Sequence, residues 1–309
     1  MQPLLLDADI FYLYDGSLEG LLSAVFLAFD SKENPSDILV EEGLQYSLLG
    51  SYQSVSTDLD HAERVMTGIV STLGARCYEE VRSVYLSDED HKGGVILRFL
   101  QYAFKHGRHS LLHLAHPAVN EFKEMLLRVT NEAHFIMMFA RFAELEGGVF
   151  FARVEPRANV VPIVMEHFAE RFNIQPFVLF DRAHQLAGVF DTSSWWLVDT
   201  RRLDVTFPDN SRSEEGFQSL WQTFFDTIAI EERHNPVCQR NFMPKRFWGT
   251  LCEQIPPELR KRRPSTETPS QAAKRAARLT GTVAAHGEIA GQGHDAQAGP
   301  CALEAGSCP

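Results

Sequence analysis

The sequence predicts an α+β fold, in which a helical N-terminal half precedes a mainly antiparallel sheet in the order ββαβββα, with C-terminal helices. Two observations support this fold class. Apolar residues recur at helical spacing up to about residue 130, whereas aromatic and β-branched residues gather in short segments after His134. A chain of 309 residues with 44% hydrophobic and 23% charged side chains can bury one large core or two modest ones.

The first half begins with a short aromatic strand over Phe11–Tyr14. This strand is expected to pass through Asp15 and Gly16 into a helix, for which Ser17 is a suitable N-cap. Pro117 suits the first turn of a later helix. Apolar residues at helical spacing predict helices over residues 18–29, 62–73, 96–104 and 119–129.

Directly after His134 the apolar residues no longer recur at helical spacing. Aromatic and β-prone residues over 135–142 and 149–155, separated by a Glu-Gly-Gly turn, predict a β-hairpin. A helix is expected over 160–172, because its apolar residues recur at helical spacing and Pro162 is tolerated in the first turn. Three short strands are then expected over residues 177–181, 187–191 and 195–199.

A strong amphipathic helix is expected near the end of the folded part, with Ser213 as its N-cap and an acidic first turn that suits the helix dipole. Its apolar face consists of Phe217, Leu220, Trp221, Phe224 and Ile228. Residues 1–258 are therefore interpreted as one α+β unit, which could divide into a helical part over 1–130 and a sheet with helices over 131–258. Residues 259–309 begin basic and then become rich in Ala, Gly, Ser and Pro without aromatic residues, which predicts a disordered tail.

Several chemistries lack the sequence motifs that they need. The chain has no Walker loop, no dinucleotide-binding glycine motif, no HExxH and no GxSxG. The five cysteines are scattered and show no metal-ligand spacing, so neither a metal site nor another cofactor is expected. No apolar run is long enough to span a membrane and no signal peptide is evident, which predicts a cytoplasmic protein without a membrane partner.

The formal net charge of -12 argues against wholesale attraction to nucleic acid, although a local basic face could still bind it. The segment over 231–248 combines charged, amide and aromatic side chains with two prolines, without a simple repeat. Such a segment can hold basic side chains on a defined backbone path, as a phosphate contact requires. The candidate contacts are Arg233, Asn235, Gln239, Lys245 and Arg246.

A second polar group is expected on the hairpin and on the helix that follows it. In an extended strand Arg153 and Glu155 share one face, beside Arg141 on the neighbouring strand. His167 and Arg171 are four residues apart on the next helix. Glu155 and His167 could perform acid–base chemistry on a phosphorylated or nucleobase substrate, with the arginines as substrate contacts. The same residues could equally form a structural ion-pair network.

Asp15 is a further candidate, because a carboxylate between a strand and a helix N-terminus can position a water molecule. The alternative is a structural turn and cap.

Several motifs resemble a bacterial family of uncharacterised proteins associated with DNA metabolism and DNA repair, whose domain also occurs fused to uracil-DNA glycosylase-like domains. The matching residues are Tyr14–Gly20, Phe151–Pro156, Asn159, Val160, Pro162, His167, Phe168, Arg171, Phe172, Asp181 and the segment over 231–248. The resemblance covers about residues 10–253 and adds Asn159 to the candidate contacts. It implies DNA as a partner, together with a radical-SAM protein of DNA repair. A fused glycosylase domain is not found in this chain, and the long tail departs from the family pattern.

Two hypotheses follow. In the first, the protein processes DNA, with Arg141, Arg153, Glu155 and His167 around the substrate and the 231–248 segment on phosphates. In the second, it is a noncatalytic DNA-binding or adaptor protein that presents DNA to a partner enzyme. A convergent pocket around Glu155 and His167 would favour the first, and a flat basic surface the second.

Overall fold

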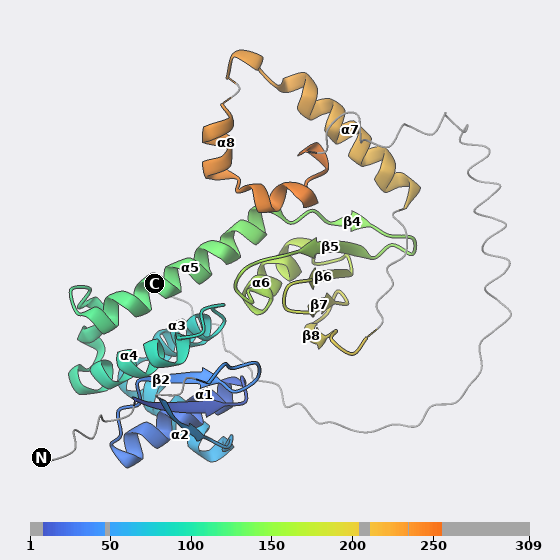
Figure 1. Cartoon of the computed structure of the whole chain (residues 1–309). Helices are drawn as coiled ribbons and strands as arrows, with labels where there is room; N and C mark the ends of the chain where they lie inside the picture. Colours follow the sequence, from blue (N-terminus) through green and yellow to red (C-terminus); the bar gives the residue numbers. More distant parts are fainter. Residues whose placement is uncertain (1–8, 47–49, 204–210, 234, 255–309) are drawn as a thin grey trace, which may run out of the picture. The chain divides into compact units, whose positions relative to one another are not determined.

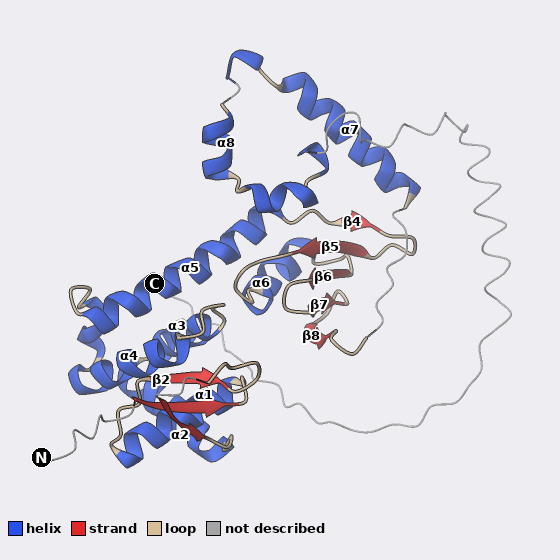
Figure 2. Ribbon diagram, in the orientation of Figure 1, coloured by secondary structure: helices blue, strands red, loops and turns tan. Residues whose placement is uncertain are grey.

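The computed structural model describes residues 9–46, 50–203, 211–233 and 235–254. These residues form a mixed α and β architecture with helices in the N-terminal half, an antiparallel-rich sheet and C-terminal helices, so the predicted fold class is confirmed. Two sheets are present among them, one of three strands and one of five (Figure 2). The predicted tail over 259–309 lies outside the described residues.

The expected strand at Phe11–Tyr14 is the centre of the three-stranded sheet, β1 (Asp9–Tyr14). Two parallel neighbours that the sequence did not predict flank it, β2 (Asp37–Val40) and β3 (Gly50–Ser54). Both are short, and β3 is largely polar, with sequence GSYQS. They therefore lack the apolar alternation that marks a strand.

Helices surround the first hydrophobic core. Ser17 is the N-cap of α1, as predicted, and its hydroxyl accepts a hydrogen bond from the Gly20 N–H at 2.9 Å. The buried side chains of this core come from β1, β2 and five helices, with Tyr12, Tyr14, Phe99 and Phe122 among the largest. Four of these helices are α1 (Leu18–Ser31), α2 (Leu59–Leu73), α3 (Ala75–Tyr85) and α4 (Lys92–His106). A short 3-10 turn over Arg108–Leu112 follows α4.

The fifth helix, α5 (Pro117–Phe139), overturns one sequence prediction. Residues 135–139 were expected to begin a hairpin strand, but they continue α5. Val129, Ala133 and Ile136 are buried at helical spacing, and this packing outweighs the β propensity of the aromatic residues around them. A hairpin is present, but its first strand is the short β4 (Ala143–Glu144), which shares no residue with the strand predicted over 135–142.

The five-stranded sheet has the order β4-β5-β6-β7-β8 (Figure 1). Its pairs are antiparallel except for β5 and β6, which are parallel and joined through α6. The helix α6 packs on this sheet, and its buried residues share a second core with Ala152, Val154, Phe177 and Leu179. The elements are β5 (Phe150–Val154), α6 (Val161–Phe172), β6 (Phe177–Asp181), β7 (Leu186–Phe190) and β8 (Trp195–Asp199).

The C-terminal part contains the expected amphipathic helix, but its cap differs from the prediction. Ser211, not Ser213, is the N-cap of α7 (Arg212–Ile228), because its hydroxyl accepts from the Glu214 N–H at 3.1 Å. The Ser213 hydroxyl instead donates to Glu144 at 2.8 Å. The apolar face of α7 is largely exposed. The elements that follow are a 3-10 turn at Glu231–Arg233, α8 (Pro236–Phe242), and 3-10 turns at Lys245–Thr250 and Cys252–Gln254.

The two cores meet along α5. Its first half contributes Val119, Phe122 and Met125 to the first core, and its second half contributes Val129 and Ile136 to the second. The described residues all belong to one compact unit. None of their helices combines the length and apolar composition that a membrane span requires.

A close approach between α4 and β2 depends on Gly93. A Cβ atom at this position would lie 2.2 Å from the Ile38 carbonyl oxygen, a backbone atom that cannot move aside alone. We therefore expect Gly93→Ala to lower the free energy of unfolding by about 1–3 kcal/mol through overpacking, although alanine favours helices. Urea denaturation followed by circular dichroism measures the change.

Gly68→Ala in α2 is the matched control. Its added Cβ would lie 3.7 Å from the nearest ring atom of Phe104, which is an ordinary contact. This variant should be neutral or more stable by up to about 1 kcal/mol. Equal stability changes in the two variants would contradict the close-approach argument.

Candidate functional site

The alternation of β5 separates its side chains between the two faces of the sheet. Ala152 and Val154 are buried in the core that α6 covers, whereas Arg153 is exposed. Phe151, Arg153 and Glu155 therefore point to the other face, as expected for extended backbone. The predicted pairing of Arg153 with Glu155 on one face is consistent with this arrangement, since both line one small cavity of about 90 Å³.

A larger cavity of about 740 Å³, here called the arginine–aromatic cavity, lies on the same side of β5. Arg141 and Arg153 contribute guanidinium groups to its lining, and Phe151, Phe217 and Trp221 contribute aromatic rings. Phe217 and Trp221 come from α7, with 67% and 45% of their surface exposed. The cavity thus combines positive charge with flat apolar surfaces that are open to a ligand.

The charge of Arg141 is balanced within the protein. Its guanidinium donates to the Glu253 carboxylate at 2.8 Å, and Arg141 lies in the coil after α5 rather than on the predicted strand. Burial opposes ionisation of Glu253, but hydrogen bonds from Arg141 and from Trp221 outweigh it and lower the pKa of this carboxyl. Burial, with the nearby Glu253 charge, raises the pKa of the Cys252 thiol to about 11, so this thiol is protonated at neutral pH.

Arg246 is also committed to an internal ion pair. Its guanidinium donates to the buried carboxylate of Glu132 on α5, which additionally accepts from the Arg157 N–H at 2.9 Å. The same guanidinium lies 4.6 Å from the ring centroid of Phe247. Arg246 therefore holds the C-terminal segment against α5, and this structural role competes with its predicted role in phosphate binding.

Arg153 differs from both of these arginines. Its guanidinium makes no ion pair or hydrogen bond with any residue that the structure describes, although it lines both cavities. Glu155, by contrast, accepts from Arg182 at 3.2 Å. Among the arginines that line these two cavities, Arg153 is thus the one whose positive charge is available to a bound anion.

His167 and Arg171 are not brought together with Glu155. They lie on α6, whose buried residues pack on the opposite face of the sheet from Arg153. Both side chains are exposed, and the His167 ring contacts that of Phe168 at 5.4 Å between centroids. No hydrogen bond between His167 and Glu155 occurs in the described part of the chain.

Asp15 has the geometry of a structural turn. Its carboxylate accepts from the Ser17 N–H at 2.9 Å, from the Ser17 hydroxyl at 2.6 Å and from Thr57 at 2.8 Å. The hydrogen bond from the Ser17 hydroxyl is the largest cause that lowers the pKa of Asp15. These donors leave the carboxylate tied to its own loop, which fits the turn-and-cap alternative.

The predicted contacts of the C-terminal segment are spread along it. Asn235 is the N-cap of α8 and accepts from the Cys238 N–H at 3.0 Å, and Gln239 donates to Gln254 at 3.4 Å. Arg233 and Lys245 are exposed, with the Lys245 ammonium 6.0 Å from the Trp248 ring centroid. Only Arg233 and Lys245 of these four present charge to solvent.

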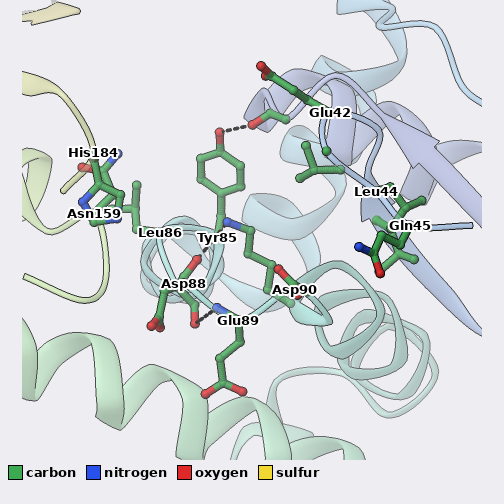
Figure 3. A pocket seen from close by; sticks show the side chains of 16 residues that line it. Glu42, Leu44, Gln45, Tyr85, Leu86, Asp88, Glu89, Asp90, Asn159 and His184 are labelled. Carbon is green, nitrogen blue, oxygen red and sulfur yellow. Dashed lines mark hydrogen bonds between the residues drawn. The ribbon is translucent and has the colours of Figure 1, made fainter. Parts of the chain in front are cut away.

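Asn159 lies apart from the other candidates. It lines a different cavity of about 750 Å³, together with His184 and residues of the first half of the chain (Figure 3). No group of three or more His, Cys, Asp or Glu side chains suited to a metal ion occurs among the described residues.

Four residues that shape these sites belong to no motif recognised in the sequence: Glu132, Glu253, Trp221 and His184. Glu132 lies in α5 and Glu253 in the last 3-10 turn. Nothing in the spacing of either residue shows that it is buried. Trp221 was assigned to an apolar helix face, which is correct, and its exposure into a cavity follows from tertiary packing.

The fold and its cavities define an α+β protein with an arginine–aromatic cavity beside its five-stranded sheet. Residues 90–253 match the family described as DUF4130, a domain of unknown function. The match covers more than half of the chain, and the chain belongs to this family. The family region includes α4 through the last described turn, and so contains Arg141, Arg153, Phe217 and Trp221. No curated protein matches the chain.

The pair of Arg141 and Glu253 predicts a pH-dependent stability. Because the folded-state pKa of Glu253 is lowered, the pair stabilises the protein fully above the unfolded carboxyl pKa of about 4.3, and this contribution is lost as pH falls through the folded value. Arg141→Met should therefore destabilise by about 3 kcal/mol at neutral pH, and by progressively less towards acid. Denaturant titrations of both proteins over this pH range measure the difference.

Arg82→Met is the control for this experiment, because Arg82 pairs with Glu79 on the surface of α3, where both side chains are at least half exposed. Its effect should stay below about 0.5 kcal/mol at every pH. An Arg141→Met effect that is small, or independent of pH, would refute the proposed role of the buried pair.

Proposed function

We propose that this protein binds DNA in a pathway of DNA metabolism or repair in the cytoplasm, and that the arginine–aromatic cavity is its DNA contact. The observation that carries the proposal is the guanidinium of Arg153, which pairs with none of the described residues and lines the same cavity as the exposed rings of Phe217 and Trp221. Guanidinium groups bind phosphate through charge-assisted hydrogen bonds, and exposed aromatic rings stack on bases.

The overall charge of the chain is compatible with this proposal only if the contact is local. A net charge of -12 repels a phosphate backbone at long range, so few phosphates should be neutralised on binding. Arg233 and Lys245, both exposed, are proposed to extend the contact along the C-terminal segment. The affinity is then expected to come largely from stacking and to respond weakly to salt.

The arrangement of the candidate acid and base favours the noncatalytic form of the proposal. Glu155 is paired with Arg182, and His167 lies on the other face of the sheet. These positions do not supply the proton acceptor and donor around one substrate that acid–base chemistry requires. We therefore propose that this cavity presents DNA to a partner enzyme, and the family resemblance suggests a radical-SAM protein for that partner.

Arg153→Gln tests the phosphate contact. We expect weaker binding of a single-stranded oligonucleotide, and a slope of log affinity against log salt that is lower by about one unit, because one phosphate contact is lost. Fluorescence anisotropy at several salt concentrations measures both quantities. Arg171→Gln, an exposed arginine on the opposite side of the sheet, should leave affinity and slope unchanged. An unchanged slope for Arg153→Gln would remove this residue from the contact.

Phe217→Ala tests stacking in the same cavity. Loss of one base–ring contact should weaken single-strand binding by about 1–3 kcal/mol while the salt slope stays the same, because no charge is removed. Phe242→Ala is the matched control, since Phe242 is 75% exposed on α8 and does not line the cavity. Equal losses in the two variants would indicate a nonspecific apolar effect and count against the cavity.

A further inference from the structure

The second large cavity, which contains His184 and Asn159, has a chemical character opposite to that of the arginine–aromatic cavity. It measures about 750 Å³. In Figure 3, His184 and Asn159 lie on one side, Glu42, Leu44 and Gln45 on the other, and the segment from Tyr85 to Asp90 between them. The three walls come from separate parts of the chain, so the cavity exists only in the folded protein.

His184 is held in a fixed orientation by a buried carboxylate. Asp181, which is fully buried at the end of β6, accepts from the backbone N–H groups of Ala183 at 2.9 Å and His184 at 3.2 Å. Its second oxygen lies 2.6 Å from Nδ1 of His184. A carboxylate accepts hydrogen bonds, so Nδ1 carries a ring proton, and Nε2 is a hydrogen-bond acceptor when the ring holds only that proton.

Asn159 supplies a second acceptor. Its backbone N–H donates to the Leu86 carbonyl at 2.9 Å, which fixes the residue at the cavity wall. Its side-chain Oδ1 atom is buried and receives no hydrogen bond from any described residue. A buried acceptor without a donor costs about 1–3 kcal/mol, and a ligand that donates to it after a small rotation of the amide group removes this cost.

The charged lining is predominantly acidic. Glu42, Asp88, Glu89 and Asp90 contribute carboxylates, and Lys92 contributes one ammonium group. Glu89 is paired with Arg128 at 2.7 Å. The side chains of Asp88 and Asp90 form no ion pair or hydrogen bond within the described ranges, and they interact with the Lys92 ammonium only through longer-range electrostatic attraction.

The strong donors of this lining are already used inside the protein. The Lys92 ammonium donates to the Ser87 carbonyl at 2.9 Å and lies 5.2 Å from the Tyr85 ring centroid. The Tyr85 hydroxyl donates to the Gly16 carbonyl at 2.6 Å. The cavity therefore offers unused acceptors and negative charge, which would repel a phosphate and attract a cationic donor.

We propose that this cavity binds a small organic cation with an ammonium or guanidinium group, which donates hydrogen bonds to Oδ1 of Asn159 and Nε2 of His184. The carboxylates of Asp88 and Asp90 balance its charge. The site is independent of the DNA contact, because the two cavities share no lining residue and have opposite charge.

Isothermal titration calorimetry of the full chain with agmatine, which carries one ammonium and one guanidinium group, tests the proposal. Butane-1,4-diol, which lacks both cations, serves as the neutral comparison. We expect saturable binding of agmatine and no binding of the diol. Absence of agmatine binding, or equal binding of the two compounds, would overturn the proposal.

Variants distinguish a specific binding site from general electrostatic attraction of the cation to acidic side chains. Asn159→Leu and His184→Phe should each weaken agmatine binding about tenfold, the effect of one lost hydrogen bond to a cation. Asp88→Asn should weaken it less, and Arg171→Ala should not change it. Unchanged affinity in both Asn159→Leu and His184→Phe would show that the surface carboxylates alone attract the cation, and would refute the site.

Asn159→Asp is the control for a loss of agmatine binding that is caused by misfolding. It preserves the shape and the acceptor of Asn159 and adds a negative charge, so agmatine should bind at least as tightly as to the unmodified chain. Circular dichroism and DNA binding of each variant report on the fold. Weaker binding by a folded Asn159→Asp protein would contradict the proposed contact.

Discussion

The helix α5 is the element on which the rest of the structure depends. Its 23 residues contribute Val119, Phe122 and Met125 to one hydrophobic core, and Val129, Ala133 and Ile136 to the other. A single continuous helix therefore packs against both the helical first half and the five-stranded sheet. Each core needs the apolar stripe of α5 to exclude water, and a break in this helix would uncover both. The long helix explains why residues 135–139, although rich in aromatic side chains, do not form a strand.

Two buried carboxylates, Glu132 and Glu253, then decide how the C-terminal segment is attached. Glu132 on α5 accepts from the β5–α6 loop and from Arg246, and Glu253 accepts from Arg141. A buried carboxylate without a cationic partner is strongly destabilising, so these arginines are required where they are. A basic side chain near a cavity is therefore not always free to bind a ligand. Arg141 and Arg246 contribute their charge to the fold, whereas the charge of Arg153 is not balanced by any described residue.

The five-stranded sheet separates functional groups that look adjacent in the sequence. Residues Arg153 and His167 are only fourteen positions apart, yet one lies on the face below α7 and the other on the helix that covers the opposite face. The two large cavities also differ in the charge of their lining residues. One combines an unpaired guanidinium with exposed rings, and the other combines carboxylates with acceptors held by Asp181 and by the backbone of Asn159. Under the two proposals, an anionic polymer and a small cation bind independently, because neither ligand suits the other cavity.

The sequence by itself determined which residues are helical where apolar spacing is strong, as in α1, α2, α4 and α7, and which side chains of β5 share a face. It identified Ser17 as a cap, because this property depends on neighbours within a few positions. Only the tertiary structure decided that 135–139 stay helical, that Ser211 caps α7, and that Glu132, Glu253 and Asp181 are buried acids with partners far away or on the next turn. It also decided that His184 and Asn159 share a cavity with Tyr85. Periodicity shows which face of an element is apolar, but the partner that covers this face is chosen by packing between segments distant in the chain.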